Sequence, residues 1–107
     1  MDPANPEVKK FLLALLNEII TTYKPDGINL DYIRYPQAIS TAAMGNWGYT
    51  ETARTMFYQQ YGVDPISMTG SHTLWKAWSD FRRKQITDFV AKVGELGNAK
   101  NMYISAV

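Results

Sequence analysis

The sequence lacks the residues that several kinds of functional site require. It contains no cysteine, which excludes a disulfide framework, a thiolate nucleophile and a cysteine-based zinc site among these residues. Its one histidine, His72, has no second histidine at a metal-ligand spacing. The sequence also contains no Walker loop, dinucleotide-binding glycine motif or G-x-S-x-G elbow. It therefore predicts no metal site and no cofactor.

Net charge and long apolar runs are also scarce. The 11 basic and 10 acidic residues leave a formal net charge of +1, whereas nucleic-acid-binding domains usually carry a strong basic excess on one face. The longest apolar run, FLLALL, has six residues, and a transmembrane helix needs about 20. We therefore expect neither a nucleic-acid partner nor a transmembrane segment.

Hydrophobic periodicity predicts three helices, at about residues 6–23, 51–61 and 73–96. Asn5 can cap the first helix, and Pro6 suits its first position. Thr50 is a suitable N-cap for the second helix, which Gly62 then ends. We expect the third helix to end before Gly97, since glycine commonly follows the last residue of a helix.

Two further stretches, at about residues 28–33 and 102–107, are expected to be strands. A long helix separates them, which predicts parallel strands joined by a right-handed crossover. Two strands rarely make a stable sheet. We therefore expect an α/β fold in which residues 1–107 are a single fragment of a larger domain. The open strand edges would also allow a second copy to pair, which predicts a homo-oligomer.

The stretch GINLDYIRYP places polar side chains inside a predicted strand. Strict alternation puts Ile28, Leu30 and Tyr32 on a face that can pack on helices, and Asn29 and Asp31 on the other face. Asp31 lies toward the C-terminal end of the strand, where the active sites of parallel sheets form, and the longest loop of the chain follows. An active-site role and a purely structural role for Asp31 are both open from this pattern.

The third predicted helix has a related feature. Arg82 falls within the apolar stripe that contains Trp78, whereas Arg83 projects toward solvent. An unpaired buried charge is very costly, so Arg82 needs a partner. The candidates are Asp31, Asp80 and carboxylates outside this fragment. A structural ion pair and direct contact with a ligand both explain such an arginine. In either case, we expect Arg82 to be more buried than Arg83.

Aromatic residues on the loops add candidate ligand contacts. Trp47 and Tyr49 lie on the loop that would cover the site, where their rings can stack on a sugar or simply hold the loop in place. The residues predicted to bind substrate are Asn29, Tyr32, Arg34, Tyr35, Trp47, Tyr49 and Arg82.

Three blocks of the sequence resemble successive motifs of one protein family. They are DPANPEVKKFLLALLNEIITTY, DGINLDYIRYP and WSDFRRKQITDFV. They resemble the glycosyl-hydrolase-like (family-10-like) TIM-barrel proteins, which include glycosyl hydrolase lipoproteins. Members show D-P-x-N-P-x-V-R, then an apolar strand with D-D-Y and Y-P, then a helix with W-R-R and F-V. The three blocks occur in this order over nearly the whole chain.

The resemblance implies a part of a (β/α)₈ barrel and the hydrolysis of O-glycosidic bonds in cell-wall or other complex glycans. It also implies an extracytoplasmic location, either periplasmic or as a cell-surface lipoprotein. Asp31 matches the first aspartate of the strand motif and is the predicted catalytic residue, whereas Tyr32 stands where many members have a second aspartate. Arg82 and Arg83 match the two arginines of the helix motif, and Phe81 replaces the tryptophan before them.

Glycoside hydrolysis generally uses two carboxyl groups, and the sequence assigns only Asp31. We therefore expect this fragment alone to be inactive. Two alternatives remain: a carbohydrate-binding or structural barrel without catalysis, motivated by Tyr32, and a self-contained α/β domain that associates through its strand edges.

Overall fold

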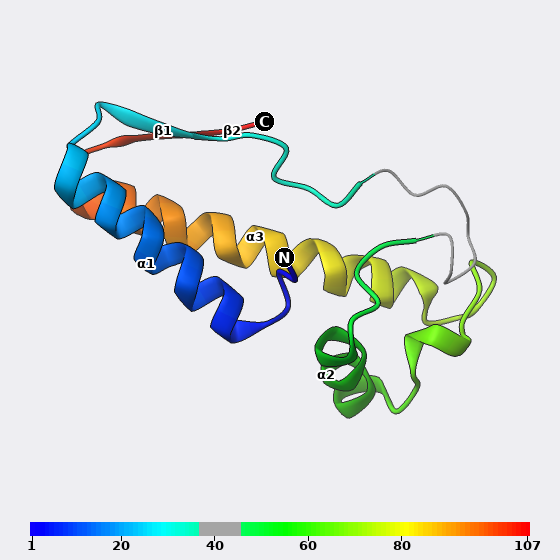
Figure 1. The fold of residues 1–107 in the computed structure, drawn as a ribbon. Coiled ribbons are helices and arrows are strands. Elements are labelled where there is room, and N and C mark those ends of the chain that lie inside the picture. Colours follow the sequence, from blue (N-terminus) through cyan, green and yellow to red (C-terminus); the bar gives the residue numbers. More distant parts are fainter. Residues whose placement is uncertain (37–45) are drawn as a thin grey trace.

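The computed structural model describes residues 1–36 and 46–107, so part of the predicted long loop lies outside the described residues (Figure 1). The elements occur in the order α1 (Pro6–Tyr23), β1 (Gly27–Leu30), α2 (Glu51–Tyr61), a 3-10 helix η2 (Pro65–Ser67), α3 (Trp75–Ala99) and β2 (Tyr103–Ala106). The fold is α/β with a small parallel sheet, as the sequence predicts. A barrel would need further strands and remains a proposal.

The first two helices begin and end where their capping residues predict. The side chain of Asn5 accepts a hydrogen bond of 2.9 Å from the Glu7 amide at the start of α1. At the start of α2, the Thr50 hydroxyl accepts one of 3.2 Å from the Ala53 amide. Gly62 ends α2 in the left-handed conformation, with φ of 74°. These local bonds pair backbone N–H groups that a helix cannot pair internally.

The third helix continues beyond its predicted end. Gly97 lies inside α3, and the helix ends only at Ala99. Gly97 is buried, and a Cβ atom there would collide with the side chain of Ile104 on β2. The glycine therefore allows close approach between the helix and the strand, and it does not terminate the helix as the sequence pattern suggests.

The two strands pair in parallel. Gly27 lies opposite Tyr103, and Asn29 lies opposite Ser105. Figure 1 shows α1 and α3 side by side on one face of this pair. Ile28, Leu30 and Ile104 are partly buried, whereas Asn29 and Ser105 are exposed. One face of the sheet therefore packs on helices, and the other is polar.

The first strand is shorter than predicted, since it ends at Leu30. Tyr32 adopts a left-handed conformation with φ of 50°, which breaks the extended backbone on which alternation depends. The expectation that Tyr32 packs on the helices is therefore wrong, because its side chain is 73% exposed. Ile33 and Tyr35 are partly buried instead.

The main buried cluster lies away from the sheet, where α2 meets the first half of α3. Phe57 and Trp78 are both fully buried, and their ring centroids are 5.2 Å apart in an edge-to-face arrangement. Trp78 also stacks on Phe81 at 5.5 Å. Aromatic pairs of this kind stabilise a core beyond their area of burial. The cluster therefore anchors α2, and with it Thr50 just before α2, to the long helix.

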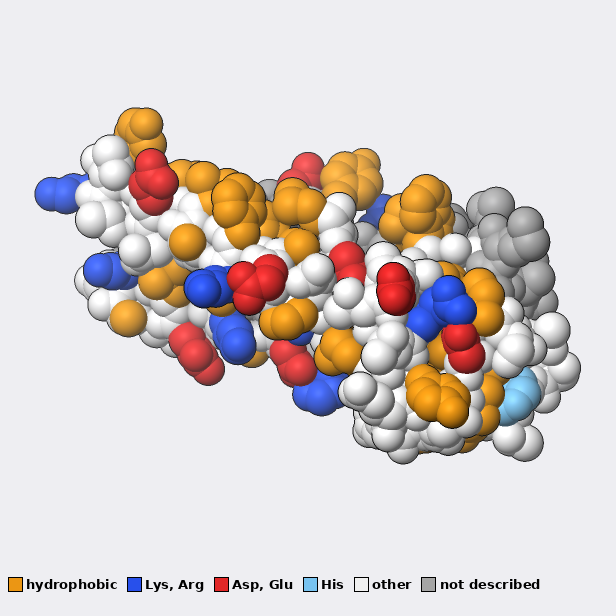
Figure 2. All heavy atoms as spheres, turned by 60° about the horizontal axis from the view of Figure 1, so that its bottom comes forward, with side chains coloured by type: hydrophobic (Ala, Val, Ile, Leu, Met, Phe, Trp, Pro, Cys, Tyr) orange, Lys and Arg blue, Asp and Glu red, His pale blue; other side chains and the backbone are white. Residues whose placement is uncertain are grey.

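The helical face of the molecule mixes acidic and basic side chains (Figure 2). On α3, Asp80 pairs with Lys76 and Arg83, and Lys84 pairs with Asp88. These pairs lie three or four residues apart, which places their side chains on the same side of the helix. Within the described ranges, no helix is long and apolar enough to cross a membrane.

Candidate functional site

The polar face of the sheet carries the predicted catalytic residue at its C-terminal edge. The Ser105 hydroxyl donates a hydrogen bond of 2.7 Å to the Asn29 side-chain oxygen across the two strands. Asp31 directly follows β1, is exposed, and accepts a hydrogen bond of 3.0 Å from the Tyr32 amide through Oδ1. Among the residues described here, no side chain bonds its second oxygen. Asp31 is therefore open to a ligand at the edge where parallel sheets carry their sites.

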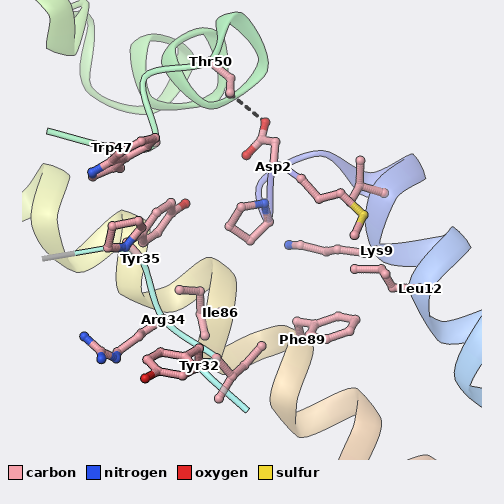
Figure 3. Close-up of a pocket in the computed structure, with 16 residues that line it drawn as sticks. Asp2, Lys9, Leu12, Tyr32, Arg34, Tyr35, Trp47, Thr50, Ile86 and Phe89 are labelled. Carbon is pink, nitrogen blue, oxygen red and sulfur yellow. Dashed lines mark hydrogen bonds between the residues drawn. The ribbon is translucent and has the colours of Figure 1, made fainter. Parts of the chain in front are cut away.

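A pocket of about 510 Å³ lies beside the segment that follows β1 (Figure 3). Tyr32, Arg34, Tyr35 and Trp47 all line it, so the structure brings together four of the residues predicted to bind substrate. Asn29 and Asp31 are not among the lining residues. The candidate site therefore has two parts, the polar strand edge and the adjacent pocket.

The pocket has an apolar floor and a partly aromatic rim. Leu12 of α1 and Ile86 and Phe89 of α3 lie on the floor. At the rim, Tyr32 is 73% exposed and Trp47 is 55% exposed. Flat exposed rings beside a few polar groups are typical of sites that bind small polar ligands.

Asp2 joins the N-terminal segment to the start of α2. Its Oδ1 accepts a hydrogen bond of 2.9 Å from the Ala4 amide, and its Oδ2 accepts one of 2.6 Å from the Thr50 hydroxyl. Figure 3 shows this second bond at the upper edge of the pocket. The sequence motif that contains Asp2 does not reveal this contact, because the bonding partner, Thr50, is 48 positions away.

Lys9 is a second pocket residue that the sequence reasoning missed. Its Nζ donates a hydrogen bond of 2.9 Å to the side-chain oxygen of Gln85, which is only 6% exposed. Burial lowers the pKa of Lys9, and the charge of Asp88 opposes this effect. The signal was present in the sequence, because Lys9 shares a helical face with Leu16 and Ile20.

Tyr35 is the most perturbed titratable group of the pocket. Burial and, to a smaller extent, the charge of Asp2 together raise its pKa from 10.0 to about 12, against the opposing charge of Arg82. Its hydroxyl is buried and has no hydrogen-bond partner among the described residues. Gly48 packs closely on the ring, since a Cβ atom there would lie 3.0 Å from Tyr35 Cε1.

Arg82 is partly buried and Arg83 is exposed, so the expected difference between them is confirmed. Neither candidate within the chain is its partner among the described residues, however. Asp80 pairs with Arg83 and Lys76, and Arg82 donates a hydrogen bond of 2.8 Å to the backbone carbonyl of Trp47. Burial lowers the pKa of Arg82. The side chain therefore connects α3 to the pocket rim.

The rings near Arg82 complete this contact. Its guanidinium carbon lies 5.6 Å from the centre of the Tyr49 ring and 5.3 Å from that of Trp78. Such distances allow cation–π attraction, which compensates a guanidinium that has no carboxylate partner within residues 1–36 and 46–107. The Tyr49 ring packs on Trp78 at 5.2 Å and does not line the pocket. Of the two loop aromatics, only Trp47 therefore presents its ring to the pocket.

The family model for glycosyl hydrolase-like 10 proteins matches residues 1–105. The chain belongs to this family. An S-layer-related protein of Niallia circulans is 28% identical over 103 residues, which cover 90% of this chain and 6% of that protein. No solved structure matches the chain. Membership of the glycosyl hydrolase-like 10 family confirms the resemblance that the three sequence blocks indicate.

Within the described part of this glycosyl hydrolase-like chain, no group of three or more histidine, cysteine, aspartate or glutamate side chains is placed to hold a metal ion. The chemistry available at the candidate site is that of the Asp31 carboxylate, the ammonium of Lys9, the guanidinium of Arg34 and the rings of the pocket rim.

Proposed function

We propose that this chain forms one side of a site that binds glycans and hydrolyses O-glycosidic bonds. The observation that carries the proposal is the exposed carboxylate of Asp31 at the C-terminal edge of the sheet, beside a pocket with exposed Tyr32 and Trp47 rings. Membership of a glycosyl hydrolase-like family supports the same activity.

In this proposal, Asp31 is one of two carboxyl groups. Glycoside hydrolysis uses a pair about 5–5.5 Å apart for retention of configuration and about 6.5–9.5 Å apart for inversion. One group donates a proton to the leaving oxygen, and the other attacks the sugar or activates water. We propose that the partner of Asp31 comes from a neighbouring strand of a complete (β/α)₈ barrel.

The pocket would hold the sugar next to this carboxylate. Tyr32 and Trp47 offer exposed ring faces on which a sugar can stack. The guanidinium carbon of Arg34 lies 5.3 Å from the centre of the Tyr32 ring. This contact would hold the ring in place and leave the guanidinium N–H groups available for sugar hydroxyls.

We also propose an extracytoplasmic or cell-surface location. Support comes from the family and from the name of the S-layer-related relative. The chain spans only 6% of that relative's length, so the activity, substrates and partners of a complete protein are part of this proposal.

The test compares wild-type full-length protein with Asp31→Asn on a panel of cell-wall and other complex glycans. We expect the substitution to reduce hydrolysis by about 100-fold or more, the usual contribution of an acid or base group. Asp26→Asn is the matched control, because Asp26 is also exposed but lies just before β1, at the opposite end of the strand. An active protein in which Asp31→Asn changes nothing would exclude a catalytic role for Asp31.

A glycan-binding protein without catalysis is the second candidate. The observation that favours it is Tyr32, an exposed ring at the position where the resembling motif has its second aspartate. Binding of a glycan without release of reducing ends, in a folded full-length protein, would support this candidate over hydrolysis.

As the alternative to a complete barrel, we propose that this chain is a self-contained α/β domain that associates through its open sheet. In the described residues, β1 and β2 pair only with each other, so each strand has one free edge. Free edges can pair with another chain. Light scattering tests this, and a monodisperse monomer would contradict it.

A further inference from the structure

Lys9 brings a positive charge into the otherwise mainly apolar pocket. It extends from the first turns of α1, and Figure 3 shows its ammonium group pointing toward the interior of the pocket, between Asp2 and Phe89. The neighbouring Lys10 is exposed and does not line the pocket. The helical period therefore separates two adjacent lysines into one that faces the pocket and one that faces solvent.

The ammonium of Lys9 is held in place but is not neutralised. One N–H donates to the buried Gln85, whose own amide group donates a hydrogen bond of 3.4 Å to the Phe81 carbonyl. An ammonium has three donors, so two remain for a ligand. Among the described residues, Lys9 forms no ion pair. Its lowered pKa agrees with a charge that lacks sufficient compensation.

The charged side chains that line the pocket carry more positive than negative charge. Arg34 lines the pocket and likewise forms no ion pair in the described part of the chain. Asp2 is the one carboxylate among the described side chains that line the pocket. Both of its oxygens already accept hydrogen bonds, from Ala4 and Thr50. Two cations thus face one carboxylate whose oxygens are engaged, and an anionic ligand would complement them.

We propose that this pocket binds an acidic sugar, with Lys9 as the residue that recognises its carboxylate. This inference rests on the proposed glycan-binding function and names the class of ligand. The ring of the sugar lies against the aromatic rim at Trp47, and its carboxylate accepts a charge-assisted hydrogen bond from Lys9. Arg34, which is exposed, adds a weaker and more strongly screened attraction.

The experiment measures binding of two matched ligands to the full-length protein by isothermal titration calorimetry at low salt. One ligand is a trimer of galacturonic acid. The other is the neutral trisaccharide obtained by reducing its carboxyl groups to alcohols. The wild-type protein is compared with three variants. Lys9→Met keeps an unbranched side chain without charge, and Lys9→Arg keeps the charge. Lys10→Met is the matched surface control.

We expect the wild-type protein to bind the acidic trimer about tenfold more tightly than the neutral one, the scale of one hydrogen bond to a charged group. Lys9→Met should remove this preference, so that the acidic and the neutral trimer bind equally. Lys9→Arg and Lys10→Met should keep the preference.

Two outcomes would overturn the inference, and they differ in what else they exclude. If the wild-type protein binds both trisaccharides equally, or if Lys9→Met keeps the preference, the acidic-sugar inference is wrong while glycan binding stands. If neither trisaccharide nor any other glycan of the panel binds, the proposed function fails together with the inference.

Discussion

Arg82 donates a hydrogen bond of 2.8 Å from Nη1 to the backbone carbonyl of Trp47. This contact joins the long helix α3 to the segment that carries the exposed ring of the pocket rim. Because the acceptor is a carbonyl, the bond fixes the position of the backbone and leaves the Trp47 side chain free to contact a ligand. Arg82 therefore acts on the pocket through Trp47.

Replacement of Arg82 by glutamine should loosen the pocket rim. We expect Arg82→Gln to lower the free energy of unfolding by about 1.5 kcal/mol, the scale of a hydrogen bond to a charged group. Arg83→Gln should change it by less than about 0.5 kcal/mol, because its ion pair with Asp80 is exposed. Urea denaturation measures both. Equal effects of the two substitutions would contradict a structural role for the Arg82 contact.

Gly48 should tolerate a methyl group less well than Gly62. Both glycines have positive φ, 88° and 74° respectively, so an alanine at either position carries backbone strain of about 1–2 kcal/mol. At Gly62 the added Cβ meets nothing within 4 Å, whereas at Gly48 it lies 3.0 Å from the Tyr35 ring and 3.1 Å from Arg82 Cδ. We expect Gly48→Ala to lower the free energy of unfolding more than Gly62→Ala, as thermal unfolding would show. Equal effects of the two substitutions would mean that the Tyr35 and Arg82 side chains move aside easily.

The sequence predicted those parts of the structure that local physics determines. The caps at Asn5 and Thr50 gave the bounds of α1 and α2, because capping depends on residues two or three positions away. The burial of Arg82 followed from helical periodicity. Its partner did not, because a backbone carbonyl leaves no signal in the side-chain pattern. The left-handed conformation of Tyr32 was also missed, because tyrosine rarely adopts it.

The candidate site was predictable to a similar extent. The strand motif pointed to Asp31 and to three of the pocket side chains, and the aromatic residues of the following loop pointed to a fourth, Trp47. The contribution of Asp2 was not predictable, because it depends on Thr50, which is distant in sequence. Long-range contacts of this kind arise only when α1 and α2 pack on the same long helix.

The two glycines of α3 should respond in opposite directions to alanine. Gly94 has no neighbour within 4 Å of an added Cβ, so Gly94→Ala should stabilise the helix by about 0.5–1 kcal/mol through its higher helix propensity. Gly97→Ala should destabilise the protein, because the methyl group collides with Ile104 on β2. Urea denaturation of the two variants measures the difference. Stabilisation by both would mean that α3 and β2 do not pack closely at Gly97.

Tyr35 should make the stability of the protein decrease at alkaline pH. Its pKa rises from 10.0 to about 12 in the folded chain, so between these values the unfolded chain loses the phenolic proton while the folded chain retains it. The unfolded state then binds fewer protons, and the free energy of unfolding falls as pH rises through this window. Tyr35→Phe should reduce this fall and remove the tyrosine ionisation with a pKa of about 12. Urea denaturation at pH 8 to 11 and the ultraviolet absorbance of tyrosinate measure the two effects.

Tyr58→Phe is the control, because Tyr58 is 56% exposed on α2. This variant should leave the late ionisation of Tyr35 in place. A variant without Tyr35 that keeps the late ionisation and the full decline would show that the buried phenol is not their cause.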